Sequence, residues 1–223
     1  MKKEIYLIKE VGNETYQQFS NRILSLATSV SNDNNVVQLK VVLTSVSPAK
    51  ISVIPFKKEK IAAISVFSAI TGKYNLLINE PGFLGGYNVD EAIPVAYEKS
   101  WADGQTTPGV SLLTLFRQKK GINYNTFIHR WHNGHTPLSL KIHPLWNYNR
   151  NVVKEKLSDN SGEWDGIVEE HFRKTSDLLN PIKFFGNPFV MVYNMLCVYF
   201  DTKSFLDYKT IEPYFATEIW IKS

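Results

Sequence analysis

Residues 110 to 172 constrain the fold of this 223-residue chain more than any other stretch. An apolar strand at Val110–Arg117 runs into a Gly-Ile-Asn turn, and Asn123 can cap a helix that continues to about His132. Two further strands follow, at Trp146–Val153 and at Gly166–Phe172. The order strand, helix, strand, strand begins a βαββαβ unit, which is an α+β arrangement.

The remaining C-terminal residues complete this unit. Helical stretches are expected at Ser176–Leu179 and from Pro188 to about Phe200, because Pro188 suits a first helical turn. A last strand is expected at Thr217–Lys222. The polar segment Glu98–Pro108, which contains Ala102-Asp103-Gly104, predicts a boundary before the unit, with a plain surface loop as the alternative.

The N-terminal residues predict a second unit of the same element order. Four strands are expected, at Glu4–Lys9, Val36–Thr44, Lys60–Ala69 and Tyr87–Tyr97. A helix from Tyr16 to about Ser29, capped by Asn13 or Thr15, separates the first two. Glycines and prolines in residues 74–87 predict a break in regular structure. We therefore predict two βαββαβ halves, residues 1–98 and 99–223.

Short motifs in the second half resemble a known family. Phe127, Trp131 and His135 follow one another at steps of four, with Pro137 just after. A later element comprises Asp165, Gly166, Ile167, Glu169 and Phe172. This pattern resembles the EthD-like family of dimeric α/β barrels, and YEKSWADGQTTPGVSLL and HPLWNYNRNVV resemble its longer, two-repeat branch. The match covers about residues 95–220.

The resemblance implies a fold and suggests an activity. Two tandem ferredoxin-like halves would pack into one barrel, which other members form by dimerising. The first half lacks a Trp-x-x-x-His pair, so it is expected to be degenerate. Some fungal relatives are linked to decarboxylation or dehydration of aromatic polyketides. The implied function is a cofactor-independent lyase or isomerase acting on a small hydrophobic molecule. The alternative is a non-catalytic binding or accessory protein.

His135 is the first candidate for the chemistry. A continuing helix would place it on one face with Phe127 and Trp131, although Gly134 and Pro137 predict that the helix bends or ends there. Such a histidine can act as a general acid or base. The alternative is a core histidine that hydrogen-bonds a backbone carbonyl and holds the bend.

Other residues are candidates for supporting roles. Asp165 or Glu169 could orient His135 and raise its pKa, while Asp165 could instead only shape its turn. His143, in a loop, could be a second titratable group at the mouth of the pocket. The residues expected to bind substrate are Phe127, Trp131, Trp146, Tyr148, Asn151 and Arg117. Asn147, Asn149 and Asn151 share the strand face opposite Trp146 and Tyr148, which predicts either a solvent face or a polar pocket wall.

Composition excludes several classes of protein. The net charge of +4 is mild, and the strand signature of RNA-binding modules is absent, so no nucleic-acid partner is expected. No apolar window is long enough to cross a membrane, and the first residues do not resemble a signal peptide. Cys197 is the single cysteine and is expected to be a buried, inert thiol in a cytoplasmic protein. Pairing with a second copy stays open.

No cofactor or metal is expected. The chain has no phosphate loop or nucleophile elbow, and Gly82, Gly85 and Gly86 do not have the spacing of a dinucleotide-binding fingerprint. His129, His132 and His135 invite a zinc interpretation, but they lack the His pair four residues apart and the helical glutamate of metalloproteases. Haem binding through a pocket histidine is a further alternative.

Overall fold

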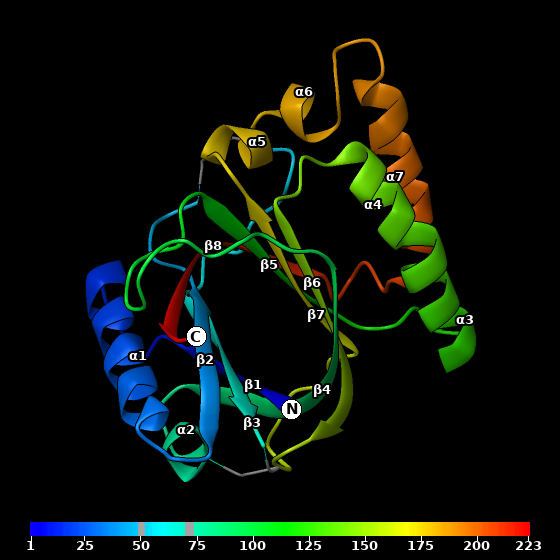
Figure 1. Ribbon diagram of the computed structural model, residues 1–223. Coiled ribbons are helices and arrows are strands. Elements are labelled where there is room, and N and C mark those ends of the chain that lie inside the picture. The colour runs from blue at the N-terminus through cyan, green and yellow to red at the C-terminus, as the bar shows by residue number, and fades with distance from the viewer. Residues whose placement is uncertain (49–51, 70–73) are drawn as a thin grey trace.

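The computed structural model describes residues 1–48, 52–69 and 74–223, and within them the strands close into one antiparallel barrel (Figure 1). The strands are β1 (Lys2–Lys9), β2 (Val36–Leu43), β3 (Ile61–Ser68), β4 (Phe83–Val95), β5 (Val110–Phe116), β6 (Asn147–Lys156), β7 (Gly166–Phe172) and β8 (Glu212–Lys222). Their order around the barrel is β1-β3-β2-β8-β5-β7-β6-β4.

The strand order contains the same pattern twice. Strands of the first 98 residues are neighbours in the order β4-β1-β3-β2, and those that follow are neighbours in the order β8-β5-β7-β6. Both correspond to the ferredoxin-like order 4-1-3-2. Pairing of β2 with β8 and of β4 with β6 joins the halves into the barrel. The predicted fold class, two ferredoxin-like halves forming a barrel within one chain, is therefore confirmed.

Strand alternation gives the barrel an interior core and two outer cores. The interior core includes Ile5, Leu7, Val42, Leu113 and Ile167. Outside the first half, α1 (Tyr16–Ser31) packs Phe19, Ile23 and Ala27 onto the sheet. Thr15 caps this helix through a capping box with Gln18, which confirms one of the two predicted caps.

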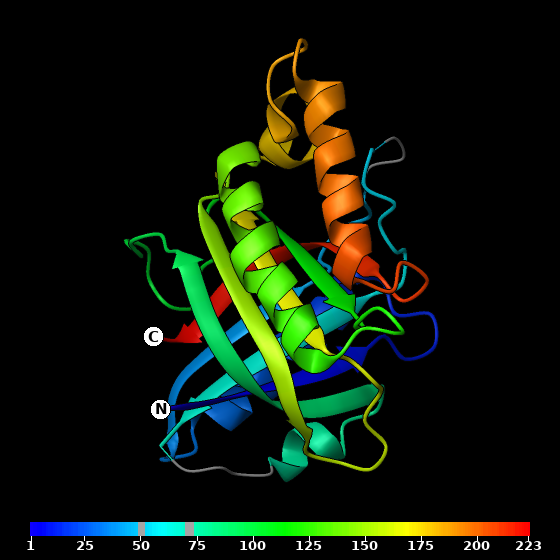
Figure 2. The same ribbon diagram turned by 90° about the vertical axis from the view of Figure 1, so that its right-hand side faces the viewer.

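Helices of the second half cover the other outer face (Figure 2). They are α3 (Tyr124–His129), the π-helical η1 (Arg130–His135), α4 (Thr136–Ile142), α5 (Thr175–Leu179), α6 (Pro181–Phe184) and α7 (Met191–Phe205). Between β3 and β4, where the second half has α5 to α7 between β7 and β8, the first half has only α2 (Asn75–Ile78) among the described residues. The 15-residue α7 therefore has no helix of similar length as its counterpart in the described part of the first half.

Of the two outcomes predicted near Gly134 and Pro137, a bend or an end of the helix, the end is wrong. The helical run continues from Tyr124 to Ile142, with η1 between α3 and α4. The backbone N–H of Thr136 donates to the carbonyl of Trp131, five residues back, so the helix widens into a π turn. Pro137 lies in the first turn of α4, where its missing N–H is tolerated.

Two other expectations also need correction. β4 begins at Phe83, so Gly85 and Gly86 lie inside a strand rather than in a break. Aromatic rings occupy the space of the absent side chains: a Cβ on Gly85 would lie 2.2 Å from the Tyr87 hydroxyl oxygen, and one on Gly86 would lie 3.1 Å from the Tyr6 ring. Cys197 is only half-buried, because much of α7 faces outward. In the described parts of the chain, no helix combines the length and apolarity needed to cross a membrane.

We predict that Gly166→Ala destabilises the protein by about 1–3 kcal/mol, the usual cost of overpacking a core. The added Cβ would lie 2.3 Å from the Phe116 ring and 2.9 Å from the Trp131 ring. Urea denaturation followed by circular dichroism measures the change. Gly134→Ala is the control, since the nearest atom there is 3.6 Å away, and it should be neutral or stabilising by up to about 1 kcal/mol. Equal effects of the two substitutions would contradict this packing argument.

Candidate functional site

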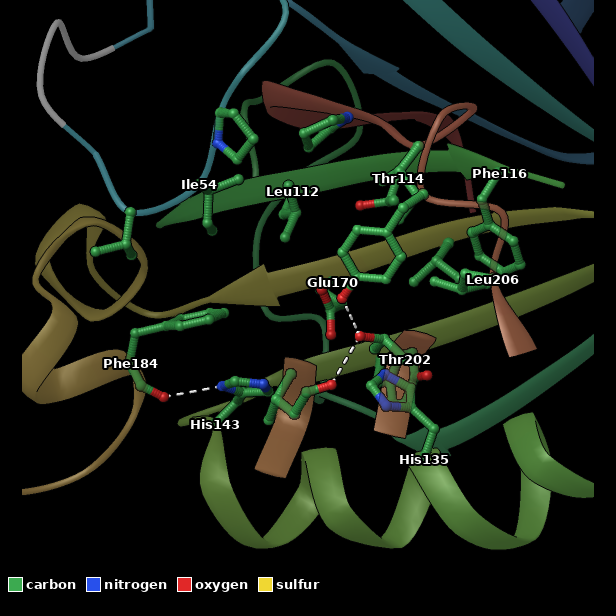
Figure 3. Close-up of a pocket in the computed structure, with 18 of the residues that line it drawn as sticks. Ile54, Leu112, Thr114, Phe116, His135, His143, Glu170, Phe184, Thr202 and Leu206 are labelled. Atoms are coloured by element: carbon green, nitrogen blue, oxygen red, sulfur yellow. Dashed lines mark hydrogen bonds between the residues drawn. The ribbon is translucent and has the colours of Figure 1, made fainter. Parts of the chain in front are cut away.

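A cavity of about 320 Å³ lies between the outer face of the second-half sheet and the helices (Figure 3). Strands β5, β6 and β7 form its floor, and α7 and the helical run ending in α4 form its walls. A segment of the first half, Val53–Pro55, closes one side. Its apolar lining includes Leu112, Phe116, Val168, Phe184, Val198, Phe205, Leu206 and Ile211. The cavity is therefore suited to a small, mostly apolar molecule.

The strand register places Glu170 in the floor of this cavity. On β7, Glu170 lies directly opposite Leu112 of β5 and Tyr148 of β6, and all three side chains line the cavity. The neighbours of Glu170 on the same face of β7 are Val168 and Phe172, both buried in apolar clusters. A carboxyl group thus occupies an otherwise apolar row. Figure 3 shows it at the centre, with His135 and His143 on the side of α4.

The protonation of Glu170 is set by this environment. No described side chain donates a hydrogen bond to its carboxyl group or pairs with it, and burial raises its pKa to about 7. Burial, and then the charge of Glu170, also raise the pKa of Tyr148. A carboxyl group with a pKa near 7 is present in both its acid and its base form at neutral pH, which is the condition for general acid–base catalysis.

His143 contributes a neutral imidazole. Its Nδ1 donates a hydrogen bond to the Phe184 carbonyl oxygen at 2.9 Å, and its ring stacks on the Phe184 ring with centroids 4.1 Å apart. Burial lowers its pKa to about 4, so the ring is uncharged at neutral pH. Because Nδ1 carries the proton, Nε2 is a hydrogen-bond acceptor, and no described residue occupies it.

Hydroxyl groups from α7 and the segment after it form a polar pair in the cavity wall. The Thr202 and Tyr208 hydroxyls hydrogen-bond each other, and Thr202 Oγ1 also donates to the Val198 carbonyl at 2.7 Å. Because the Thr202 hydroxyl proton is used in the bond to the Val198 carbonyl, the Tyr208 hydroxyl donates to Thr202 Oγ1. Both residues line the cavity, so either oxygen can meet a polar atom of a ligand.

His135 lines the cavity but already uses both ring nitrogens. Nδ1 donates to Asp201 at 2.7 Å, and Ser139 Oγ lies 3.0 Å from Nε2, where it can donate. The ring also packs on Phe205, with centroids 5.4 Å apart. His135 therefore ties the π-helical turn to α7. A proton transfer from His135 to a ligand would require one of these hydrogen bonds to break.

The other predicted aromatic residues are distributed over three places. Tyr148 lines the cavity, as expected for a ligand contact. Phe127 and Trp131 pack behind the cavity against Phe116 and are fully buried. Trp146 precedes β6 and packs against Tyr97 with ring centroids 5.2 Å apart, so it does not share the face of Tyr148.

The predicted polar residues lie away from the cavity. Asp165 accepts a hydrogen bond from the Gln118 backbone at 2.7 Å, which is its alternative role in shaping the turn. Arg117 donates to the Glu163 carbonyl at 2.6 Å, near the same end of β7. Asn151 is inside the barrel and donates to the Ile167 carbonyl at 3.0 Å. Across the described residues, no group of three or more His, Cys, Asp or Glu side chains is placed to hold a metal ion.

Glu170 is the residue that sequence reasoning missed. The sequence pattern indicates Glu169 instead, but consecutive strand residues point to opposite faces, so Glu169 enters the barrel and Glu170 enters the cavity. The alternation Gly166, Val168, Glu170, Phe172 contained the signal, because it places one acid among apolar residues. Using that signal required knowing which face of β7 the helices cover.

We predict that Glu170→Gln changes the pH dependence of stability. The pKa of Glu170 is raised from 4.5 to about 7, so the folded state holds this proton more tightly than the unfolded state. The free energy of unfolding of the wild-type protein should therefore fall as pH rises from about 4.5 to 7. Relative to wild type, the variant should gain up to about 3 kcal/mol above pH 7 and little at pH 4. Urea denaturation at several pH values measures this difference.

The control for this prediction is Glu155→Gln, which removes an exposed carboxylate from β6. The pKa values of His132 and His143 are both lowered to about 4 by burial, and they give stability an opposite pH dependence. That contribution is common to all variants and cancels in the difference from wild type. A Glu170→Gln difference that is the same at pH 4 and pH 8 would contradict the raised pKa.

Comparisons with known proteins bear on the fold. No protein-family model and no curated protein matches the sequence. The chain is similar to an anthrone oxidase-like protein with a TM-score of 0.60 and 7% identity, over 98% of this chain and 90% of that one. It is similar to a candidate monooxygenase of Fusobacterium nucleatum with a TM-score of 0.52 and 10% identity, over 99% and 92% of the two chains. At such identities the likeness concerns the fold alone, an α/β barrel that two ferredoxin-like halves form within one polypeptide.

Proposed function

We propose that this protein binds a small, mostly apolar aromatic molecule in the cavity and that Glu170 moves a proton on it. The observation that carries the proposal is an unpaired carboxyl group with a pKa of about 7 on an apolar cavity floor. Such perturbed groups are concentrated at functional sites. The neutral His143 and the Thr202–Tyr208 pair provide polar contacts that can fix the orientation of the ligand.

The proposed chemistry is removal of a proton from a carbon whose negative charge can be delocalised, directly or through an aromatic ring, onto the carbonyl oxygen of an aromatic ketone. Glu170 in its carboxylate form accepts the proton, and the substrate carbanion shares its charge with the carbonyl oxygen. A hydroxyl group of the cavity wall, such as that of Tyr208, can donate to that oxygen and stabilise the charge. Returning the proton to a different atom gives an isomerase or, with loss of a leaving group, a lyase. Neither outcome needs a cofactor.

The family resemblance supports the same substrate class. We propose that the chain is an EthD-like protein. Some relatives in that family are linked to aromatic polyketides, and such molecules would fit an apolar cavity of this size. One structural neighbour is described as anthrone oxidase-like, and an anthrone has an acidic CH₂ group between aromatic rings. Anthrone is therefore a suitable probe. His135, the residue first predicted as acid or base, remains the competing candidate for the proton transfer.

A non-catalytic binding protein is the second candidate function. The observation that favours it is that His135 already hydrogen-bonds Asp201 and Ser139 through its two nitrogens. In that case the cavity would hold a hydrophobic metabolite, and Glu170 would only recognise a polar group on it. The two candidates differ in whether a bound ligand exchanges protons.

The test is proton exchange at the CH₂ group of anthrone in deuterated buffer, followed by NMR, with oxygen uptake recorded in parallel. We expect the wild-type protein to accelerate exchange and Glu170→Gln to lower this rate by about 10²–10⁴-fold, the usual contribution of a general base. Anthrone affinity, measured by quenching of tryptophan fluorescence, should change little. Oxygen uptake would show that the carbanion goes on to react with dioxygen.

Two further variants make the result decisive. Glu155→Gln, at an exposed position, should exchange anthrone at the wild-type rate. If His135→Gln abolishes exchange while Glu170→Gln retains it, Glu170 is not the base and His135 takes that role. If all variants bind anthrone and even the wild-type protein fails to accelerate exchange, the binding protein is the better description for this ligand.

A further inference from the structure

One end of the barrel interior contains a chain of alternating charges. Lys3 Nζ lies 2.8 Å from Glu91 and 3.8 Å from Glu169. Lys40 Nζ lies 2.6 Å from Glu169 and 3.2 Å from Glu218. The order along this chain is therefore Glu91, Lys3, Glu169, Lys40, Glu218. Three carboxylates and two ammonium groups leave a net charge of −1.

The two ends of the charge chain differ. At one end, Glu218 is buried and also accepts hydrogen bonds from the Thr107 hydroxyl at 2.9 Å and from the Tyr97 hydroxyl. At the other end, the Glu91 side chain is 20% exposed, whereas the side chains of the other four charges are at most 3% exposed. The excess negative charge can therefore be reached from outside only at Glu91.

Asn149 places an unused acceptor beside Glu91. Its Nδ2 donates to Glu91 Oε1 at 2.6 Å, and because a carboxylate only accepts, this bond fixes the orientation of the amide. The amide oxygen, Asn149 Oδ1, is then buried without a hydrogen-bond partner, and the residue is 3% exposed. A buried acceptor without a partner is destabilising, so a donor from a ligand would recover that free energy.

A cavity of about 230 Å³ opens in front of these acceptors, at the end of the barrel where both termini lie (Figure 2). Glu91, Asn147, Asn149 and the paired Lys40 line it together with three aromatic residues, Phe67, Tyr97 and Trp220. The Phe67 and Trp220 rings are nearly parallel, with an interplanar angle of 21° and centroids 6.2 Å apart. The cavity thus combines aromatic walls with the Glu91 carboxylate and with the buried, unpartnered Asn149 Oδ1, at one end of a charge chain of net charge −1.

We propose that this barrel-mouth cavity is a second binding site, which takes a small primary amine in its ammonium form. The ammonium group would donate to Asn149 Oδ1 and to Glu91, and the apolar body would lie against the aromatic walls, where Lys3 already lies over the Phe67 ring and Lys40 over the Trp220 ring. An anion does not suit the site, because Lys3 and Lys40 already pair with carboxylates. The site lies inside the barrel and is independent of the function proposed for the Glu170 cavity.

The probe for this proposal is benzylammonium chloride, titrated into the full-length protein by isothermal calorimetry at pH 7. Benzyl alcohol and benzoate are the neutral and anionic comparisons of similar shape. We expect benzylammonium to bind at least tenfold more tightly than either one. Glu91→Gln should weaken its binding by tenfold to a hundredfold, the usual effect of losing a hydrogen bond to a charged group.

Three further variants guard against misinterpretation. Asp90→Asn removes the same charge from the exposed neighbouring position of β4, and Glu170→Gln alters the other cavity; both should leave benzylammonium binding unchanged. Trp220→Leu should weaken binding even if Glu91→Gln fails to fold, as judged by circular dichroism. Equal binding of benzoate, no binding of benzylammonium, or undiminished binding by both Glu91→Gln and Trp220→Leu would overturn the proposal and leave Asn149 Oδ1 as a site for solvent water.

Discussion

Hydrogen bonding of β2 to β8 and of β4 to β6 closes the sheet, and both cavities depend on that closure. In a closed barrel each strand has one face inside and one face outside, so adjacent residues enter different environments. Glu169 and Glu170 show the consequence. Inside, Lys3 and Lys40 more than offset the effect of burial and lower the pKa of Glu169. Outside, nothing offsets burial, and the pKa of Glu170 rises to about 7. One residue becomes a structural anion and its neighbour a candidate acid or base.

The buried charges also explain how the halves are held in register. Lys40 of β2 contacts Glu169 of β7 and Glu218 of β8, so each contact joins the first half to the second. Burial alone would lower the pKa of Lys40, but the two carboxylates more than offset this and raise it. Removing one member would leave an unpaired buried charge, which is far more costly than an unpaired charge at the surface. A slip of one residue along either seam would have this effect, so the charge network selects a single register.

Much of the architecture could be predicted from local pattern. The Thr15 cap, the strand β7 at Gly166–Phe172, and the uninterrupted apolar run of β3 depend on neighbouring residues, and the structure agrees with each. The errors share a different cause. Gly85 and Gly86 lie within β4 because the ring of Tyr87 and the ring of the distant Tyr6 fill their space, and Pro137 is tolerated because a π turn precedes it. Trp146 does not lie on the predicted strand face, because β6 starts one residue later and the Trp146 ring packs against Tyr97 and Trp101.

The sequence by itself determined the element order, the repeated βαββαβ pattern and the α+β class, because these follow from hydrophobic period, caps and turn residues within short windows. It also indicated His135 and Tyr148 as candidate site residues, and both line the Glu170 cavity. Only the tertiary structure decided which face of each strand is covered by helices, and therefore that Glu170 is isolated in an apolar cavity while Asn149 faces the barrel interior. Those environments arise from contacts between residues far apart in the chain, and no local pattern records which residues will meet.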